Sequence, residues 1–255
     1  MHEGMAAPLT AFRLVMTLAA GLAAAMLAPM AGAAPTTLRD ALVGDGRPDV
    51  PVIARYQTDE GGGFVLDRSS PLPLLKFEDD PEIWVLQPAP SARGDTVYRN
   101  DIGEPMLRAT RFGGMTVFTS SRPDGSAAAL EGVSPPLRMP PLPPAVLFNR
   151  FYQASVRTSR AAQHQVGFET REDAEPATAA LLADTAMVAS EALVSIAGRP
   201  GGKTLLARIT DVLIAQGDRA GAVLQRGVLT ITIVPAKGLA GRPSSRRIEH
   251  AAGGH

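Results

Sequence analysis

The feature that most constrains the fold is a change of hydrophobic period along the chain. Between residues 50 and 121, short runs rich in Val, Ile, Leu, Phe and Thr recur, and Gly, Pro and Asp separate them about every eight to twelve residues. This spacing is typical of an antiparallel meander that closes into a small barrel or sandwich. We therefore predict an N-terminal β module over residues 46–122. Alternation within the runs is imperfect, so the strand order stays open.

Prolines dominate the end of the next stretch, "PDGSAAALEGVSPPLRMPPLPP". Proline fixes φ and lacks the amide that a buried strand must pair, so a proline-rich segment is extended and lies at the surface. The pattern predicts a Gly/Pro-rich linker over residues 123–144.

Helical periodicity begins at Ala145. Residues 145–160 place one set of side chains on a common face, namely Leu147, Phe148, Phe151, Tyr152 and Ser155. Residues 175–198 predict a second helix whose buried arc holds Leu181, Leu182, Thr185, Val188, Ala189, Leu193 and Ile196. Gly198 stands where a C-cap glycine belongs.

Strand periodicity returns near the C-terminus. Residues 228–234, "VLTITIV", alternate apolar and Thr side chains, and "ITDVLIAQ" is expected to pair with them across the glycine-rich turn 217–227. A short last helix is expected with Ser244 or Ser245 as its N-cap. We predict an α+β module over residues 145–250, with two long helices packed on a C-terminal β-hairpin. The fold class is α+β.

The first thirty-three residues indicate the compartment. Arg13 precedes an apolar run of about seventeen residues, and Ala31-Gly32-Ala33 supplies a small-x-small cleavage site. This is the pattern of a secretory signal peptide over residues 1–33, so the protein is expected to be exported, periplasmic or secreted. The alternative is a retained membrane anchor. After cleavage we expect no stable membrane insertion.

Composition excludes several classes of function. The 25 basic and 25 acidic residues balance, which argues against a nucleic acid partner. Because the chain has no Cys, it has no disulfide, thiol nucleophile or zinc–thiolate site.

The stretch "VSIAGRPGGKT" fits a relaxed phosphate-loop pattern, but its context does not. "ALVSIAG" continues the period of the preceding helix, whereas a phosphate loop follows a strand. We interpret Gly202-Lys203-Thr204 as part of a helix–helix turn and expect no nucleotide partner.

Other catalytic patterns are sparse. HExxH, GxSxG and SxxK are absent, and His164 stands alone as an expected surface residue. No cofactor, metal ligand or catalytic residue is predicted. Carboxylates gather at Asp79, Asp80 and Glu82 and again at Glu169, Glu172 and Asp173. They could supply a catalytic pair, but they stand in turns among prolines, where solvated charges are the normal finding.

One hairpin is a possible binding surface. Its tip carries Tyr98, Arg99, Asn100 and Asp101, and its return side carries Arg108 and Arg111. These residue types contact sugars, carboxylates or peptides. The simpler interpretation is that Asn100 and Asp101, with Gly103, only make the turn.

The segments "GGGFVLDRS", "PLLKFED-PEIWVL", "RGDTVYRNDIGEPMLRAT" and "GLAGRPSSRRIEHA" together resemble an uncharacterised exported bacterial family, a domain of unknown function. The resemblance implies no activity, cofactor or site. Two functions stay open: a non-enzymatic periplasmic protein that binds an envelope component or a protein partner, and an envelope polysaccharide or peptide hydrolase with a carboxylate pair. A carboxylate pair facing one cleft would favour the hydrolase.

Overall fold

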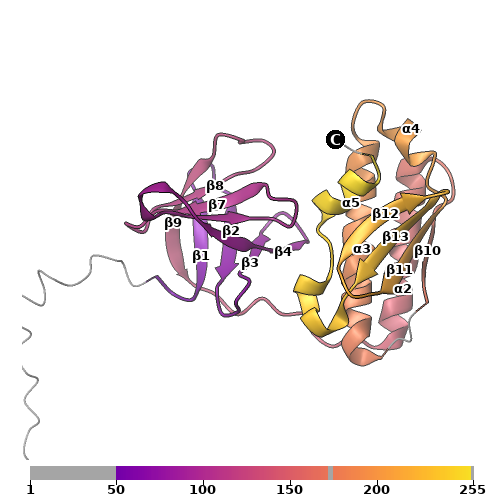
Figure 1. Cartoon of the computed structure of the whole chain (residues 1–255), viewed down its shortest axis with the longest axis horizontal. Helices are drawn as coiled ribbons and strands as arrows, with labels where there is room; N and C mark the ends of the chain where they lie inside the picture. Colours follow the sequence, from indigo (N-terminus) through magenta and orange to yellow (C-terminus); the bar gives the residue numbers. More distant parts are fainter. Residues whose placement is uncertain (1–49, 172–174, 254–255) are drawn as a thin grey trace, which may run out of the picture. The chain divides into compact units, whose positions relative to one another are not determined.

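Two sheets organise the chain, a nine-stranded sheet followed by a four-stranded sheet that carries helices (Figure 1). The structure is a computed structural model that describes residues 50–171 and 175–253. The described residues belong to one compact unit, residues 45–255. The α+β class is confirmed. The predicted signal peptide, Glu172, Asp173 and His255 lie outside the described residues.

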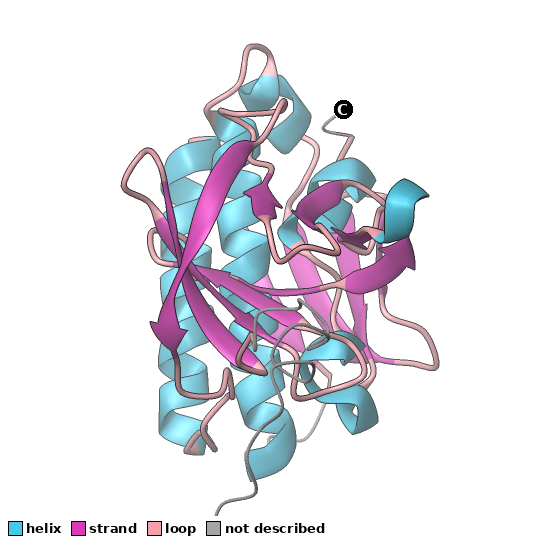
Figure 2. Cartoon of the chain, turned by 90° about the vertical axis from the view of Figure 1, so that its left-hand side faces the viewer, coloured by secondary structure: helices cyan, strands magenta, loops and turns pink. Residues whose placement is uncertain are grey.

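The larger sheet is an antiparallel meander with the order β4-β3-β2-β1-β9-β8-β7-β6-β5. Its strands are β1 (Ile53–Thr58), β2 (Gly63–Asp67), β3 (Leu74–Phe77), β4 (Ile83–Val85), β5 (Gln87–Pro90), β6 (Thr96–Arg99), β7 (Pro105–Ala109), β8 (Met115–Val117) and β9 (Ser126–Val133), with a short 3-10 turn η1 (Ala92–Gly94) before β6. The edge strands β4 and β5 are separated in the chain by Leu86 alone. The sheet must therefore curl until its edges meet, and it forms a nearly closed barrel whose strands bend strongly (Figure 2).

The barrel interior is filled by alternate side chains of these strands. Phe64 stacks on Tyr56, with ring centroids 5.1 Å apart, and meets Phe77 edge-on at 6.0 Å. The remaining buried core residues are Ala54, Leu66, Leu75, Trp84, Leu86, Tyr98, Leu107, Met115 and Val117. The predicted meander is therefore confirmed as a barrel with its own hydrophobic core.

The predicted linker begins too early. Residues 126–133 form β9, which pairs with both β1 and β8 and joins the two halves of the sheet. The Ala and Gly residues of β9 have little intrinsic preference for strands. β9 is a strand because it pairs on one side with β1 and on the other with β8. Residues 134–143 have no helix or strand, as the prolines predict, and the Leu137 amide donates to Asp67 at 2.9 Å.

The second part contains α2 (Pro144–Ala162), β10 (Gly167–Thr170), α3 (Pro176–Ala197), α4 (Gly202–Leu206), β11 (Asp211–Gln216), β12 (Gly221–Gln225), β13 (Val228–Ile233), the 3-10 segment η2 (Pro235–Gly241) and α5 (Ser245–Ala251). Its sheet has the order β10-β11-β13-β12. The hairpin is β12–β13, while β11 runs parallel to β13. The expectation that β11 turns directly back onto β13 is wrong, because the presumed turn holds β12.

The seven residues predicted for the buried arc of α3 are all buried. For α2 the predicted face is partly wrong: Phe148 and Tyr152 are 74% and 64% exposed. The reason is that α2 packs against α3 through a face of small side chains. Thr158 lies on this face, and its hydroxyl donates to Ser190 at 3.2 Å. The buried stripe of α2 accordingly consists of Leu147, Phe151, Ala154, Thr158 and Ala162.

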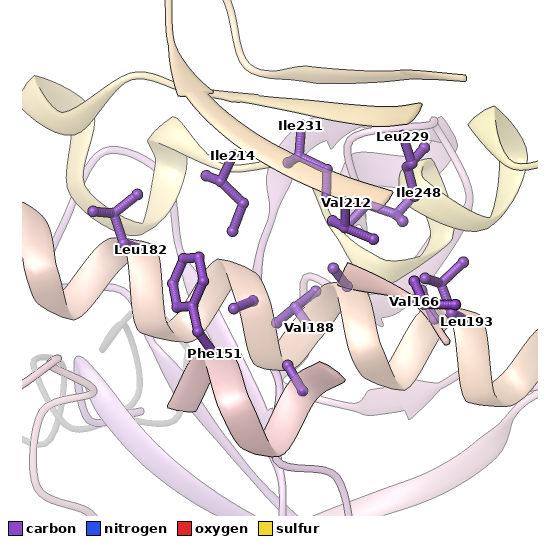
Figure 3. Packing of buried hydrophobic residues seen from close by; sticks show 14 of the residues in the cluster. Phe151, Val166, Leu182, Val188, Leu193, Val212, Ile214, Leu229, Ile231 and Ile248 are labelled. Atoms are coloured by element: carbon purple, nitrogen blue, oxygen red, sulfur yellow. The ribbon is translucent and has the colours of Figure 1, made fainter. Parts of the chain in front are cut away.

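The two long helices cover the four-stranded sheet, as predicted. Val212, Ile214, Leu229 and Ile231 point from the sheet into one apolar layer with Phe151 and residues of α3 (Figure 3). Residues 178–197 of α3 are apolar and long enough to cross a membrane by composition, but two thirds of the stretch is buried in this core. A core helix accounts for its hydropathy.

The phosphate-loop pattern lies between two helices. Residues 198–201 join α3 to α4, so a helix and not a strand precedes the glycines, as expected. Gly202, Lys203 and Thr204 themselves belong to the first turn of α4, so their assignment to the connecting turn is wrong. Gly202 is required there because a Cβ would lie 1.7 Å from the Ile196 carbonyl oxygen. Lys203 is exposed. His164 differs from expectation: it is half-buried, and its ring nitrogen Nε2 lies 2.8 Å from the Ile209 carbonyl oxygen.

Candidate functional site

The barrel has two ends, and strand direction assigns a set of loops to each. Because neighbouring strands are antiparallel throughout, β1, β3, β6 and β8 run in the same direction. The loops that follow β3, β6 and β8, residues 78–82, 100–104 and 118–125, therefore emerge at one end, which we call the loop end. These loops, with α3 and α5, line a cleft of about 990 Å³.

One segment of the second part, residues 242–247, binds this end of the barrel; we call it the clasp. The Arg242 guanidinium, whose side chain is 2% exposed, forms ion pairs with Glu82 at 3.1 Å and with Asp184. It also donates to the Ile83 carbonyl oxygen at 2.9 Å. The Ser245 amide donates to Glu82 at 3.2 Å. A buried cation thus joins β4 of the barrel to α3.

A second group of bonds extends the clasp along α5. Asp101 accepts hydrogen bonds from the Ser244 hydroxyl at 2.5 Å and from the Arg247 Nε at 2.8 Å. The Ser244 hydroxyl also accepts from the Arg247 amide, so it is the N-cap of α5, as predicted. Arg246 donates to Ser120 at 2.5 Å. The loops that follow β3, β6 and β8 therefore contact the clasp or line the cleft.

Burial controls the ionisation of the clasp. Desolvation raises the pKa of Glu82 to about 7, although Arg242 and the hydrogen bonds from Ser245 act in the opposite direction. Burial also opposes the charge of Arg242, but the nearby carboxylates of Asp184 and Glu82 outweigh it and raise the pKa of the guanidinium. Arg242 stays charged while Glu82 titrates near neutral pH.

The cleft beside the clasp is acidic and partly aromatic. Among its described lining residues, the acids are Asp79, Asp80, Glu82, Glu104, Glu191 and Glu249, and the bases are Arg199 and Arg246. Phe77, Trp84 and Phe118 contribute aromatic surface. Trp84 is the one tryptophan of the chain, and its Nε1 donates to Asp80 at 3.0 Å.

Most of these acids already have partners. Asp80 accepts from the Glu82 amide at 2.8 Å, Glu191 pairs with Arg157 at 2.6 Å, and Glu249 pairs with Arg199 at 2.6 Å. Asp79 differs: it is exposed and forms no hydrogen bond or ion pair with the residues that the structure describes. Its charge therefore faces the cleft without internal compensation.

The residues predicted at the hairpin separate into different roles. Asn100 is buried and its side chain accepts from the amides of Ile102 and Glu104, so it makes the turn. Arg99 is exposed and donates to the Gly103 carbonyl oxygen at 2.7 Å. Asp101 belongs to the clasp described above. Ligand binding by this tip stays a prediction.

The other three predicted residues lie along the strands. Arg108 pairs with Asp95 at 2.5 Å, and hydrogen bonds from Arg108 lower the pKa of that carboxyl. Tyr98 is buried in the barrel, and Arg111 lies over the Phe112 ring at 4.4 Å. Tyr98 and Arg111 both line a second cavity, at the opposite end of the barrel.

The first predicted carboxylate group stays together, because Asp79, Asp80 and Glu82 all line the cleft, but its members differ in burial. Glu82 is buried, not solvated as expected, because Arg242 and Ser245 replace its water. Glu169 lies on β10, away from the cleft-lining residues. Within residues 50–171 and 175–253, no group of three or more acids and histidines could hold a metal ion. Sequence reasoning missed Arg242, which is 160 residues from Glu82. Arg242 lies in the segment "GLAGRPSSRRIEHA", which carried the family resemblance but did not indicate the contact with Glu82.

Comparison with known proteins supplies a family and no activity. The profile described as "Domain of unknown function (DUF4908)" matches residues 37–252, which include both the barrel and the α+β part. No curated protein and no solved structure matches the chain.

Proposed function

Since the chain belongs to the DUF4908 family, we propose from its geometry that it is an exported, non-enzymatic binding protein whose cleft takes a basic segment of a protein partner. The observation that carries this proposal is the acidic, aromatic-lined cleft of about 990 Å³ beside the clasp. Ligand sites favour such junctions between structural parts, and this volume is typical of them.

Charge indicates the class of ligand. The described lining residues carry more carboxylates than guanidiniums, so the field in the cleft attracts cations. Asp79 offers an uncompensated carboxylate, and the rings of Phe77, Trp84 and Phe118 offer surfaces for apolar groups and for cation–π contacts. A lysine- or arginine-bearing peptide combines both kinds of group.

Export is supported by the N-terminal pattern around Arg13 and Ala31-Gly32-Ala33. The family match begins at residue 37, just after the expected cleavage site at Ala33. The matched domain would therefore remain whole in the exported protein, and its partner would be a protein or another component of the envelope.

Two observations favour the alternative of an envelope hydrolase. Several carboxylates, among them Asp79, Asp80 and Glu82, line one cleft. Glu82 lines the cleft with a pKa of about 7, a value suited to a general acid. Its carboxylate, however, is 4% exposed and is held by Arg242 and Ser245. A general acid must reach the substrate within hydrogen-bonding distance, and Glu82 is enclosed by the clasp. We therefore favour binding.

Trp84 fluorescence tests the proposal, because the chain's one tryptophan lines the cleft. Titration with a capped lysine–leucine–lysine peptide should change the emission saturably, and a glutamate–leucine–glutamate peptide should not. Asp79→Asn should weaken binding of the basic peptide, by about tenfold at most for an exposed charge. Asp218→Asn, which removes an exposed carboxylate in the β11–β12 turn, is the matched control. Equal response to both peptides, or an equal effect of both substitutions, would contradict the proposal.

A further inference from the structure

The second cavity lies at the end of the barrel opposite the loop end. Its lining residues come from the starts of β6 and β8, the end of β7, and the segment after β2, all of which lie at the same end of antiparallel strands. Ala109 pairs with Thr96 on one side and with Met115 on the other, so these three strands present one continuous rim. The cavity measures about 570 Å³, within the range of small-molecule sites.

The lining of this cavity is basic. Arg68 and Arg111 are its charged residues among the described lining, and no acid accompanies them. The polar remainder consists of Tyr56, Tyr98, Thr96 and Thr110, and the apolar remainder of Val50, Ala109 and Met115. The two ends of the barrel therefore have opposite charge, acidic at the clasp and basic here.

Neither guanidinium is neutralised by the part of the chain that the structure describes. No carboxylate there forms an ion pair with Arg68 or Arg111. The nearby acids already have partners: Asp95 pairs with Arg108 at 2.5 Å and accepts a hydrogen bond from the Arg111 backbone amide, and Asp67 accepts from Ser69 and from the Leu137 amide. Two positive charges at one cavity with no internal counter-ion favour an external anion.

Arg68 supplies an independent observation. Its Nη2 donates to the Pro51 carbonyl oxygen at 2.5 Å, which fixes the side chain in place. Its Nε is buried and has no hydrogen-bond partner. Among residues 50–171 and 175–253, no other buried side-chain nitrogen or oxygen lacks a partner. An unsatisfied buried donor is unfavourable, and such groups in folded proteins call for an explanation such as a ligand.

The tyrosines complete the set of donors. Tyr56 and Tyr98 are 2% and 7% exposed. Burial raises the pKa of Tyr56, although the charge of Arg68 and a side-chain hydrogen bond with Arg68 act in the opposite direction, so the Tyr56 hydroxyl stays protonated at physiological pH. Arg111 is oriented by its stacking on Phe112 at 4.4 Å.

We propose that this end of the barrel binds a small organic carboxylate, whose anionic group lies between Arg68 and Arg111 and whose apolar body contacts Val50, Ala109 and Met115. A guanidinium donates to both oxygens of a carboxylate in a fixed fork, which suits it to this role. The tyrosine and threonine hydroxyls add donors and acceptors for orientation. This site is separate from the acidic cleft and does not depend on what the cleft binds.

Calorimetric titration of the full chain with benzoate tests the proposal, with benzamide and inorganic phosphate as comparison ligands. Benzoate should bind saturably, benzamide should bind at least about tenfold more weakly, and phosphate should not match benzoate, because it lacks an apolar body. Arg111→Met should weaken benzoate binding about tenfold or more. Arg99→Met is the matched control, since Arg99 is an exposed arginine at the loop end.

Benzoate binding by the wild type and the variants decides whether this cavity is an anion site. Loss of binding in Arg111→Met with an unchanged melting temperature, together with full binding by Arg99→Met and Asp79→Asn, would support the site. Absence of benzoate binding to the wild-type chain, equal affinity for benzamide, or full binding by Arg111→Met would overturn it. If an Arg68→Met variant fails to fold, the Arg111→Met variant still tests the proposal, because Arg111 is exposed and its guanidinium contacts the ring of the neighbouring Phe112.

Discussion

Replacing Arg242 by methionine should destabilise the folded protein strongly at pH 8. The change leaves the Glu82 carboxylate, which is 4% exposed, without its cation, and removes the buried guanidinium that joins the barrel to α3. Breaking a buried ion pair by removing one partner costs about 3–5 kcal/mol. For a chain of this size, that loss lowers the melting temperature by roughly 6–20 °C.

The cost should depend on pH in a defined direction. At pH 5, Glu82 is largely protonated, because its pKa is about 7. The variant therefore leaves no unpaired negative charge buried at this position. We therefore expect the loss of stability at pH 5 to be smaller than at pH 8 by at least about 1 kcal/mol.

Urea unfolding of the wild type, Arg242→Met and Arg208→Met at both pH values measures these differences. Arg208 is an exposed arginine with no ion pair to the described residues, so its replacement should change stability by less than about 0.5 kcal/mol. A loss below about 1 kcal/mol for Arg242→Met at pH 8 would refute the reasoning that a buried charge network joins the two parts.

Three further expectations concern single positions. In the folded protein the pKa of Glu82 lies above its usual value of 4.5, so protonated Glu82 contributes fully to the free energy of unfolding below pH 4.5, and this contribution is lost as pH rises through about 7. Glu82→Gln should flatten that part of the curve of stability against pH. An unchanged curve would contradict the burial of Glu82. Lys203→Ala should change stability by less than about 0.5 kcal/mol, because Lys203 is exposed on the short helix α4. Calorimetric ATP binding that disappears in this variant would restore the phosphate-loop interpretation. Mass spectrometry of the exported protein should find an N-terminus after Ala33, and a retained leader would indicate a membrane anchor instead.

Local sequence patterns correctly predicted the elements in which one whole face is buried. The arc of α3, the alternation of β13 and the Ser244 cap of α5 each follow from neighbouring letters in the sequence. β9 was missed because pairing with β1 and β8, not its own composition, makes it a strand. Phe148 and Tyr152 were misplaced because the α2–α3 contact uses small residues such as Ala154.

The site was less accessible to sequence reasoning than the fold. Turn chemistry correctly indicated the hairpin that holds Asn100 and Asp101. The clasp depends on Arg242 meeting Glu82, which precedes β4, and Asp184, which lies on α3, and these residues are far apart in the sequence. A single sequence carries no signal of such pairing, so Glu82 looked like an ordinary solvated acid of a proline-flanked turn.

Hydrogen exchange of the full chain, with and without the lysine–leucine–lysine peptide, tests the central claim most directly. A ligand in the acidic cleft contacts the barrel and the α+β part together, so protection should rise in the same titration over residues 78–84, 191–199 and 245–249, which line the cleft. Protection confined to one of the two parts, or found instead around Arg68 and Arg111, would contradict the assignment of the cleft as the site for a basic partner.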